Sequence, residues 1–186
     1  NQRNCLQEVL IISSALSIQD PRLRPVDKAG SADEAHSKFL EPGSDFLSYL
    51  KIWQLYHHTS RKVKSNSKLR KYCTTTVLAY QRMGEWCDIY DQLCRICEKN
   101  KFTINHVPSQ QGAVHQAILS GSLRNIAMKK QKNVYLGGLG QELMVFPGSG
   151  QFNKTGQWIM AAEIVETSRL YARTVATIDP AWIEPM

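Results

Sequence analysis

The stretch Arg169-Leu-Tyr-Ala-Arg-Thr-Val-Ala-Thr-Ile178 decides how the last third of the chain folds. Its residues form two alternating series, Leu-Ala-Thr-Ala-Ile and Tyr-Arg-Val-Thr, which point to opposite faces of an extended chain. This period of two, rich in β-branched residues, predicts a β-strand. Shorter runs at 134–136, 142–146 and 157–165 are separated by glycine-rich turns and predict further strands.

The first two thirds of the chain carry the period of an α-helix instead. A first amphipathic helix is expected to stop before Asp20-Pro21, because proline cannot continue it. Another helix is expected to begin at Ser44. Gly84 is expected to break a later helical stretch into two, and a last helix is expected over residues 110–128.

Helices followed by short strands predict the α+β class. We expect a mostly helical bundle over residues 1–132 and a small barrel or sandwich over residues 133–186. The 186 residues suffice for one medium domain or two small ones. Because the chain begins at Asn1 and ends at Met186 directly after Pro185, we expect it to be cut from a longer protein.

Cysteine use and apolar patterning bear on the compartment. The five cysteines are an odd number without the spacing of a disulfide framework, which indicates a reducing, cytoplasmic environment. The longest apolar stretches are far too short to cross a bilayer, and residues 1–16 lack the cleavage site of a secretory leader. We therefore expect no membrane partner.

The net charge of +7 is concentrated in two segments without acidic residues. Residues 61–72 hold six lysines and arginines, and residues 101–133 hold five. Such segments in an otherwise balanced chain are typical of a surface that binds a polyanion. Two solvated surface loops would give the same pattern, and charge alone does not separate these alternatives.

Cys94-x-x-Cys97 is a candidate metal or redox motif, with Cys87 and His106 nearby. Zinc needs four converging donors, and no second cysteine pair is present. The motif lies inside a helical pattern, whereas a thioredoxin-like motif follows a strand. We therefore interpret these cysteines as packed thiols and expect no metal site.

Residues 148–155 come close to the phosphate-loop pattern G-x-x-x-x-G-K-[ST]. Asn153 occupies the position of the second glycine, and the following residues predict a strand. Without a helix N-terminus behind it the loop cannot direct amides at a phosphate, so no nucleotide site is expected. No Ser/His/Asp set, H-E-x-x-H motif or carboxylate pair suggests catalysis.

Several stretches resemble, in order, the C-terminal region of DEAH-box RNA helicases. They are Glu8–Pro21 with Arg22-Leu-Arg-Pro25, Ser44–Leu50 with Trp53, Val77–Arg82 with Glu85-Trp86, Ala117-Ile-Leu-Ser-Gly121, Phe146-Pro-Gly-Ser149, Trp158, Thr167–Leu170 and Thr174–Ile183. The forms I-Q-D-P-R, E-W and F-P-G-S-G are similar to the bacterial, HrpA-like members. The resemblance covers nearly the whole chain.

This resemblance implies a helical ratchet domain followed by a C-terminally truncated OB-fold. In the family both pack on two RecA-like motor domains, which bind ATP and Mg²⁺ and would lie upstream of Asn1. The resemblance therefore implies an ATP-dependent helicase whose catalytic parts are outside this chain. It further implies a single-stranded RNA channel, translocation from 3′ to 5′, and an OB-fold on which a protein activator can dock.

The residues expected to face RNA combine positive charge or hydroxyl groups with these motifs. They are Arg82, Arg124, Lys129, Lys130, Ser149, Lys154 and Arg173. Such groups neutralise or hydrogen-bond phosphates without reading sequence, so binding is expected to weaken with salt.

Two other function classes compete with this reading. A helical protein-interaction module would use its basic segments to bind an acidic partner, and would bind heparin as well as RNA. A redox or zinc protein would hold stoichiometric metal or a cysteine of depressed pKa.

Overall fold

The computed structural model describes residues 3–183, which fall into two compact units. The helical unit comprises Asn1–Leu40 and Ser48–Pro108, and the barrel unit comprises Glu41–Leu47 and Ser109–Met186. Helices in one and a closed barrel in the other confirm the predicted α+β class. The predicted boundary near residue 132 falls inside the barrel unit; as a division between ratchet domain and OB-fold it stays a prediction.

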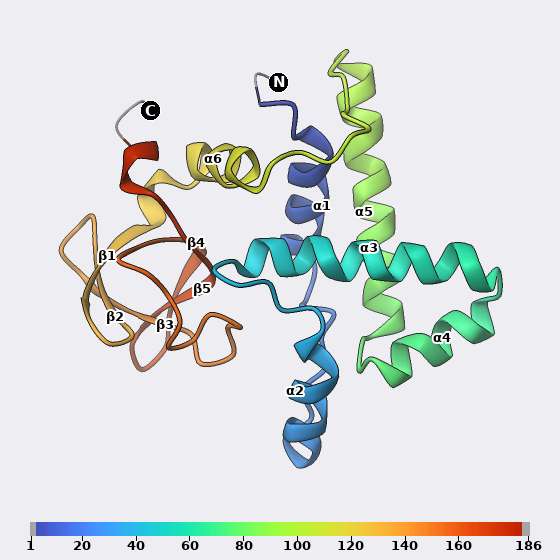
Figure 1. Cartoon of the computed structure of the whole chain (residues 1–186), viewed down its shortest axis with the longest axis horizontal. Helices are drawn as coiled ribbons and strands as arrows, with labels where there is room; N and C mark the ends of the chain where they lie inside the picture. The colour runs from blue at the N-terminus through green and yellow to red at the C-terminus, as the bar shows by residue number, and fades with distance from the viewer. Residues whose placement is uncertain (1–2, 184–186) are drawn as a thin grey trace. The chain divides into compact units, whose positions relative to one another are not determined.

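The helical unit is built around a buried tryptophan on its longest helix. Its elements are α1 (Leu6–Leu16), η1 (Val26–Lys28), α2 (Ala29–Ser37), most of α3 (Asp45–Val63), α4 (Asn66–Thr75) and α5 (Tyr80–Lys99) (Figure 1). The Trp86 indole is fully buried, and its N–H donates to Ile11 O and Ser14 Oγ, both at 3.0 Å. The Trp53 ring lies 5.2 Å from it, so α1, α3 and α5 share one core.

Gly84 does not break the helix, contrary to expectation. α5 runs through it without interruption from Tyr80 to Lys99. The cost of a glycine inside a helix is only about 1 kcal/mol. The neighbouring Met83 and Trp86 are both fully buried, and their burial outweighs that cost.

The barrel unit begins with a short helix and closes a five-stranded barrel. Its elements are α6 (Gln111–Gly121), η2 (Leu123–Asn125), β1 (Ile126–Gln131), β2 (Val134–Gly137), β3 (Glu142–Val145), β4 (Trp158–Glu166), β5 (Leu170–Thr177) and η3 (Pro180–Trp182). The strand order is β1-β2-β3-β5-β4, and β1 returns to β4 (Figure 1). All pairs are antiparallel except β3 with β5.

The expected helix over residues 110–128 is too long. α6 ends at Gly121, and β1 begins at Ile126. β1 pairs with both β2 and β4, so the tertiary ladder overrides the local helical pattern. Side chains from all five strands form the barrel core: Ala127, Tyr135, Leu143, Val145, Ile159, Ala161, Ala172 and Val175.

Residues 41–47 belong to the barrel although they precede it by about 80 residues. The Gly43 carbonyl accepts from Thr177 N at 2.9 Å, which extends the pairing of β5. The Gln151 side chain, 2% exposed, accepts from Gly43 N and donates to Glu41 O, each at 2.9 Å. We call residues 41–47 the strap.

The strap continues into the first turn of α3. Ser44 Oγ accepts from Leu47 N at 3.2 Å, which caps the helix where the sequence predicted its start. The same oxygen lies 2.8 Å from His115 Nε2 on α6. Burial lowers the pKa of His115 from its ordinary value of 6.5, because the charged imidazolium is poorly solvated there. Among residues 3–183 no helix is long and apolar enough to span a membrane.

The His115 contact predicts a pH dependence of stability. Because the folded pKa is depressed, the unfolded chain takes up the proton first, and the free energy of unfolding falls as pH drops below about 6.5. His115→Gln should reduce this slope by up to about 1.4 kcal/mol per pH unit. Buried His36 and half-buried His57 have pKa values lowered in the same sense and keep the rest of the slope.

Urea unfolding between about pH 7.5 and 5.5 measures the effect. His106→Gln, which changes an exposed histidine, is the matched control and should keep the wild-type slope. Equal slopes for the His115 and His106 variants would contradict the role given to the buried ring.

Candidate nucleic-acid interface

A buried carboxylate fixes the loop between β3 and β4. Asp45, in the first turn of α3, is 3% exposed. Its Oδ2 accepts from Ser149 Oγ at 2.5 Å and from Val175 N at 3.0 Å, and its Oδ1 accepts from Gly150 N at 3.1 Å. One side chain of the strap thus fastens both the loop and β5.

The far end of the same loop is fixed from inside the barrel. The Tyr135 hydroxyl lies 2.6 Å from Thr155 Oγ1 and donates to Gly156 O at 2.8 Å. Lys129 Nζ donates to Thr155 O at 2.9 Å. Asn153 N donates to Asn133 Oδ1 at 3.1 Å. The loop is therefore held at both ends, with Lys154 left exposed between them.

An arginine and two aromatic rings gather on the barrel wall beside this loop. The Arg173 guanidinium lies 4.6 Å from the centroid of the Phe146 ring, a cation–π contact. The Tyr171 ring meets Phe146 edge-on, with centroids 5.9 Å apart. Arg173 is exposed, and its nearest carboxylate is Glu163 at 3.6 Å. We call Phe146, Tyr171 and Arg173 the aromatic–arginine cluster.

Phe146 is absent from the residues predicted to face RNA. An aromatic residue at the end of a strand is more often part of a core than of a binding surface. The pairing of Val145 with Ala172 brings Phe146 beside β5, and only this long-range register identifies it. For the other two members of the cluster, the sequence signal was the run Tyr171-Ala-Arg173, in which an aromatic residue and a cation share one face of the strand.

The other predicted residues are placed differently. Arg124 is exposed on η2, and Lys130 on β1 forms an exposed ion pair with Glu142. Lys129 and Ser149 use their polar atoms in the hydrogen bonds described above. Arg82 lies in the helical unit, where it donates to Asp20 O at 2.8 Å. The structure therefore gathers six of the seven in the barrel unit.

The glycine-rich segment 148–155 is not built as a phosphate-binding loop. Residues 148–155 are followed by β4 rather than by a helix, as the sequence predicted, and Asn153 stands at the glycine position with φ 64°. Within residues 3–183 no three His, Cys, Asp or Glu side chains converge on a possible ion.

Two cysteines of α5, Cys87 and Cys94, lie in surroundings that keep them as thiols. Burial, with help from Asp91 and Asp88, raises the pKa of Cys87 to about 11. Burial also raises the pKa of Cys94. A thiol with a raised pKa is neither a good nucleophile nor a ready metal ligand at neutral pH.

Two family models match the chain. The model described as "Helicase associated domain (HA2), ratchet-like" matches residues 1–49, and the one described as "Oligonucleotide/oligosaccharide-binding (OB)-fold" matches residues 114–186. Over all 186 residues the chain is 43% identical to ATP-dependent RNA helicase HrpA of Escherichia coli. The chain belongs to the DEAH-box helicase family and corresponds to the C-terminal region of its members. The five-stranded barrel is the OB-fold of that region.

Two further helicases are similar to this chain along nearly all of its length. The HrpA homologue of Haemophilus influenzae is 43% identical over 183 residues, which cover 98% of this chain. A pre-mRNA-splicing factor ATP-dependent RNA helicase of Schizosaccharomyces pombe is 24% identical over 181 residues, or 96% of the chain. The chain spans 14% of the length of both HrpA proteins and 15% of the splicing factor.

The Asp45 contact predicts that alanine substitutions of Ser149 and Lys154 change the free energy of unfolding by different amounts. Ser149→Ala leaves a buried carboxylate without one of its donors, and should lower the free energy of unfolding by about 1–3 kcal/mol. Lys154→Ala should change it by less than about 0.5 kcal/mol, because the side chain is exposed. Urea unfolding measures both values, and Ser168→Ala in an exposed turn is the matched serine control. Equal stabilities of the two serine variants would contradict the account.

Proposed function

We propose that this chain is the non-catalytic C-terminal part of an ATP-dependent RNA helicase, and that its OB-fold holds single-stranded RNA. The observation that carries the proposal is the aromatic–arginine cluster beside the fixed loop that presents Lys154. Positive charge together with aromatic rings is the combination that single-strand binding uses.

The chemistry of this surface suits a strand that passes without being read. Arg173 and Lys154 can neutralise phosphates of any sequence, while an aromatic face can stack on any base. Because Asp45 and Tyr135 already hold the loop in place, little conformational entropy remains to be lost on binding. The predicted RNA-facing residues of the barrel unit fit this picture as direct contacts (Arg124, Lys130, Lys154, Arg173) or as supports of the loop (Lys129, Ser149).

The wider role follows from the family and is part of the same proposal. The relatives' names describe ATP-dependent RNA helicases, and ATP with Mg²⁺ would be bound by RecA-like motor domains outside these residues. In the whole protein the ratchet domain, with Arg82, and the OB-fold would line the RNA channel and couple motor motion to 3′-to-5′ translocation. We further propose a cytoplasmic location, and a protein activator as a second partner of the OB-fold.

Fluorescence anisotropy of a labelled single-stranded RNA of about 12 nucleotides tests the RNA contact. Lys154→Gln combined with Arg173→Gln should raise the dissociation constant about tenfold, with a weaker salt dependence because two phosphate contacts are lost. Lys28→Gln combined with Lys99→Gln makes the same change of charge at exposed sites of the helical unit. This control should stay within about twofold of wild type.

Equal losses in the two double variants would contradict the barrel surface as the site. Unlabelled heparin, compared with unlabelled RNA at equal charge, tests the competing class. If heparin displaces the labelled strand as effectively as RNA does, the chain is a docking module for acidic partners instead.

A further inference from the structure

The second basic segment of the chain forms a corner of the helical unit. α3 ends at Val63 and α4 begins at Asn66, so only Lys64 and Ser65 connect them. Lys64 has a positive φ of 44°, which lets the chain turn sharply (Figure 1). Cations from the last turn of α3, the connection and the exposed side of α4 are thereby brought to one corner.

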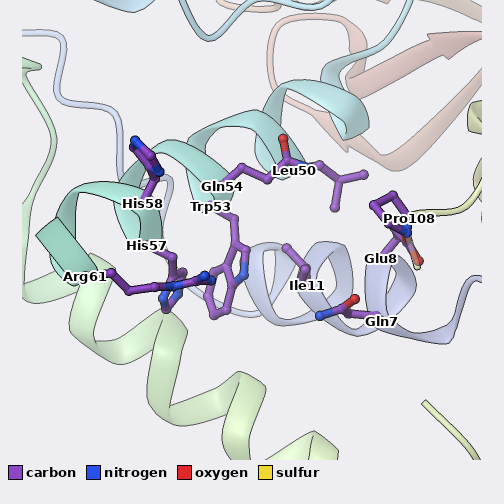
Figure 2. Close-up of a pocket in the computed structure, with 10 residues that line it drawn as sticks. All are labelled: Gln7, Glu8, Ile11, Leu50, Trp53, Gln54, His57, His58, Arg61 and Pro108. Carbon is purple, nitrogen blue, oxygen red and sulfur yellow. The ribbon is translucent and has the colours of Figure 1, made fainter. Parts of the chain in front are cut away.

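One of the six cations is engaged elsewhere. Figure 2 shows the Arg61 side chain directed back toward His57 and Trp53, at a cavity of about 320 Å³ lined mainly by α1 and α3. Burial, with help from the Arg61 charge, lowers the pKa of His57. Arg61 is therefore not counted in the surface considered below.

The other five cations face solvent without a counter-charge. They are Lys62, Lys64, Lys68, Arg70 and Lys71, and all are exposed. In the described part of the chain none of the five takes part in an ion pair. We call these five residues the basic corner. Five like charges within residues 62–71 repel one another, and a polyanion would relieve that repulsion.

The basic corner offers no ring on which a base could stack. Arg70 covers the face of Tyr80 at 4.9 Å, and Lys38 lies 5.7 Å from the centroid of the half-buried Tyr72 ring. On the barrel Arg173 covers Phe146 in the same way, but among the described residues no cation lies over the half-buried Tyr171 ring beside it. Without stacking, the phosphate backbone is the part of a nucleic acid that it can recognise.

We propose that the basic corner binds the phosphate backbone of double-stranded RNA, at a site separate from the single strand on the barrel. A duplex offers phosphates from two strands at high density, and its stacked bases need no ring from the protein. A helicase must hold structured RNA as well as the strand it draws away, so the two surfaces have complementary tasks. The inference uses the RNA-helicase role proposed above but none of the residues of the barrel site.

Anisotropy of a labelled RNA hairpin, measured at several salt concentrations, tests the inference. Lys62→Gln, Lys68→Gln and Lys71→Gln together should raise the dissociation constant for the hairpin about tenfold. They should reduce the slope of log affinity against log salt by about 2–3, close to 0.9 for each lost contact. Glutamine keeps the helix propensity of lysine, and equal helical circular dichroism verifies the fold.

The matched control removes the same three charges elsewhere in the helical unit. It combines Lys28→Gln, Arg95→Gln and Lys99→Gln, all at exposed positions, and should change hairpin affinity by less than about twofold. Affinity for the single strand should be kept in both triple variants. If the wild-type protein does not bind the single strand, but the basic-corner variant still loses hairpin affinity and its control does not, only the proposed barrel site is overturned.

Three outcomes would overturn the basic corner as a duplex site. The first is no hairpin binding at low salt, and the second is an equal loss in both triple variants. The third is displacement of the hairpin by polyglutamate as effectively as by unlabelled duplex at equal charge, which would assign the surface to an acidic protein instead.

Discussion

The buried Asp45 carboxylate is the contact on which the barrel surface depends. Three donors from two separate stretches converge on it: Ser149 Oγ, Gly150 N and Val175 N. A buried carboxylate with too few donors costs several kcal/mol, so these hydrogen bonds stabilise the strap, the loop and β5 together. Gln151 and His115 fasten the same strap at other points. The first turn of a long helix has in this way become part of an OB-fold.

This arrangement separates residues that hold the loop from residues free to meet a ligand. The hydrogen bonds of Ser149 and Lys129 are directed into the protein, whereas Lys154 is exposed and Arg173 lies over the Phe146 ring. A surface prepared in this manner binds a flexible strand without first having to order itself. At the basic corner Arg70 covers Tyr80 and the neighbouring Lys38 covers Tyr72, so both rings there carry a cation. On the barrel Arg173 covers Phe146, and the Tyr171 ring lies beside them. This difference is the reason for proposing different forms of RNA for the two surfaces.

Local patterns predicted the elements, and long-range contacts decided what the patterns could not. The strand at 170–177, the helix ending before Asp20-Pro21 and the strand after residues 148–155 were all readable, because period and proline act locally. The strict alternation predicted for that strand fails at Thr174, whose φ is 52°, so Val175 joins Ala172 in the barrel core. Gly84 and β1 were misjudged because packing and strand pairing outweigh local propensity. The strap and Phe146 gave no local signal, since Asp45 meets residues more than 100 positions away. Of the residues predicted to face RNA, Lys154 and Arg173 are exposed on the same barrel. Ser149 instead donates its hydroxyl to the buried Asp45 carboxylate.

Hydrogen exchange of backbone amides, with and without a single-stranded RNA, tests the central claim most directly. The account predicts that the RNA slows exchange in the loop 146–157 and in β5 around Arg173, while amides of the basic corner keep their rates. Slowed exchange confined to the helical unit, with the barrel unchanged, would contradict the claim that the OB-fold surface holds the strand.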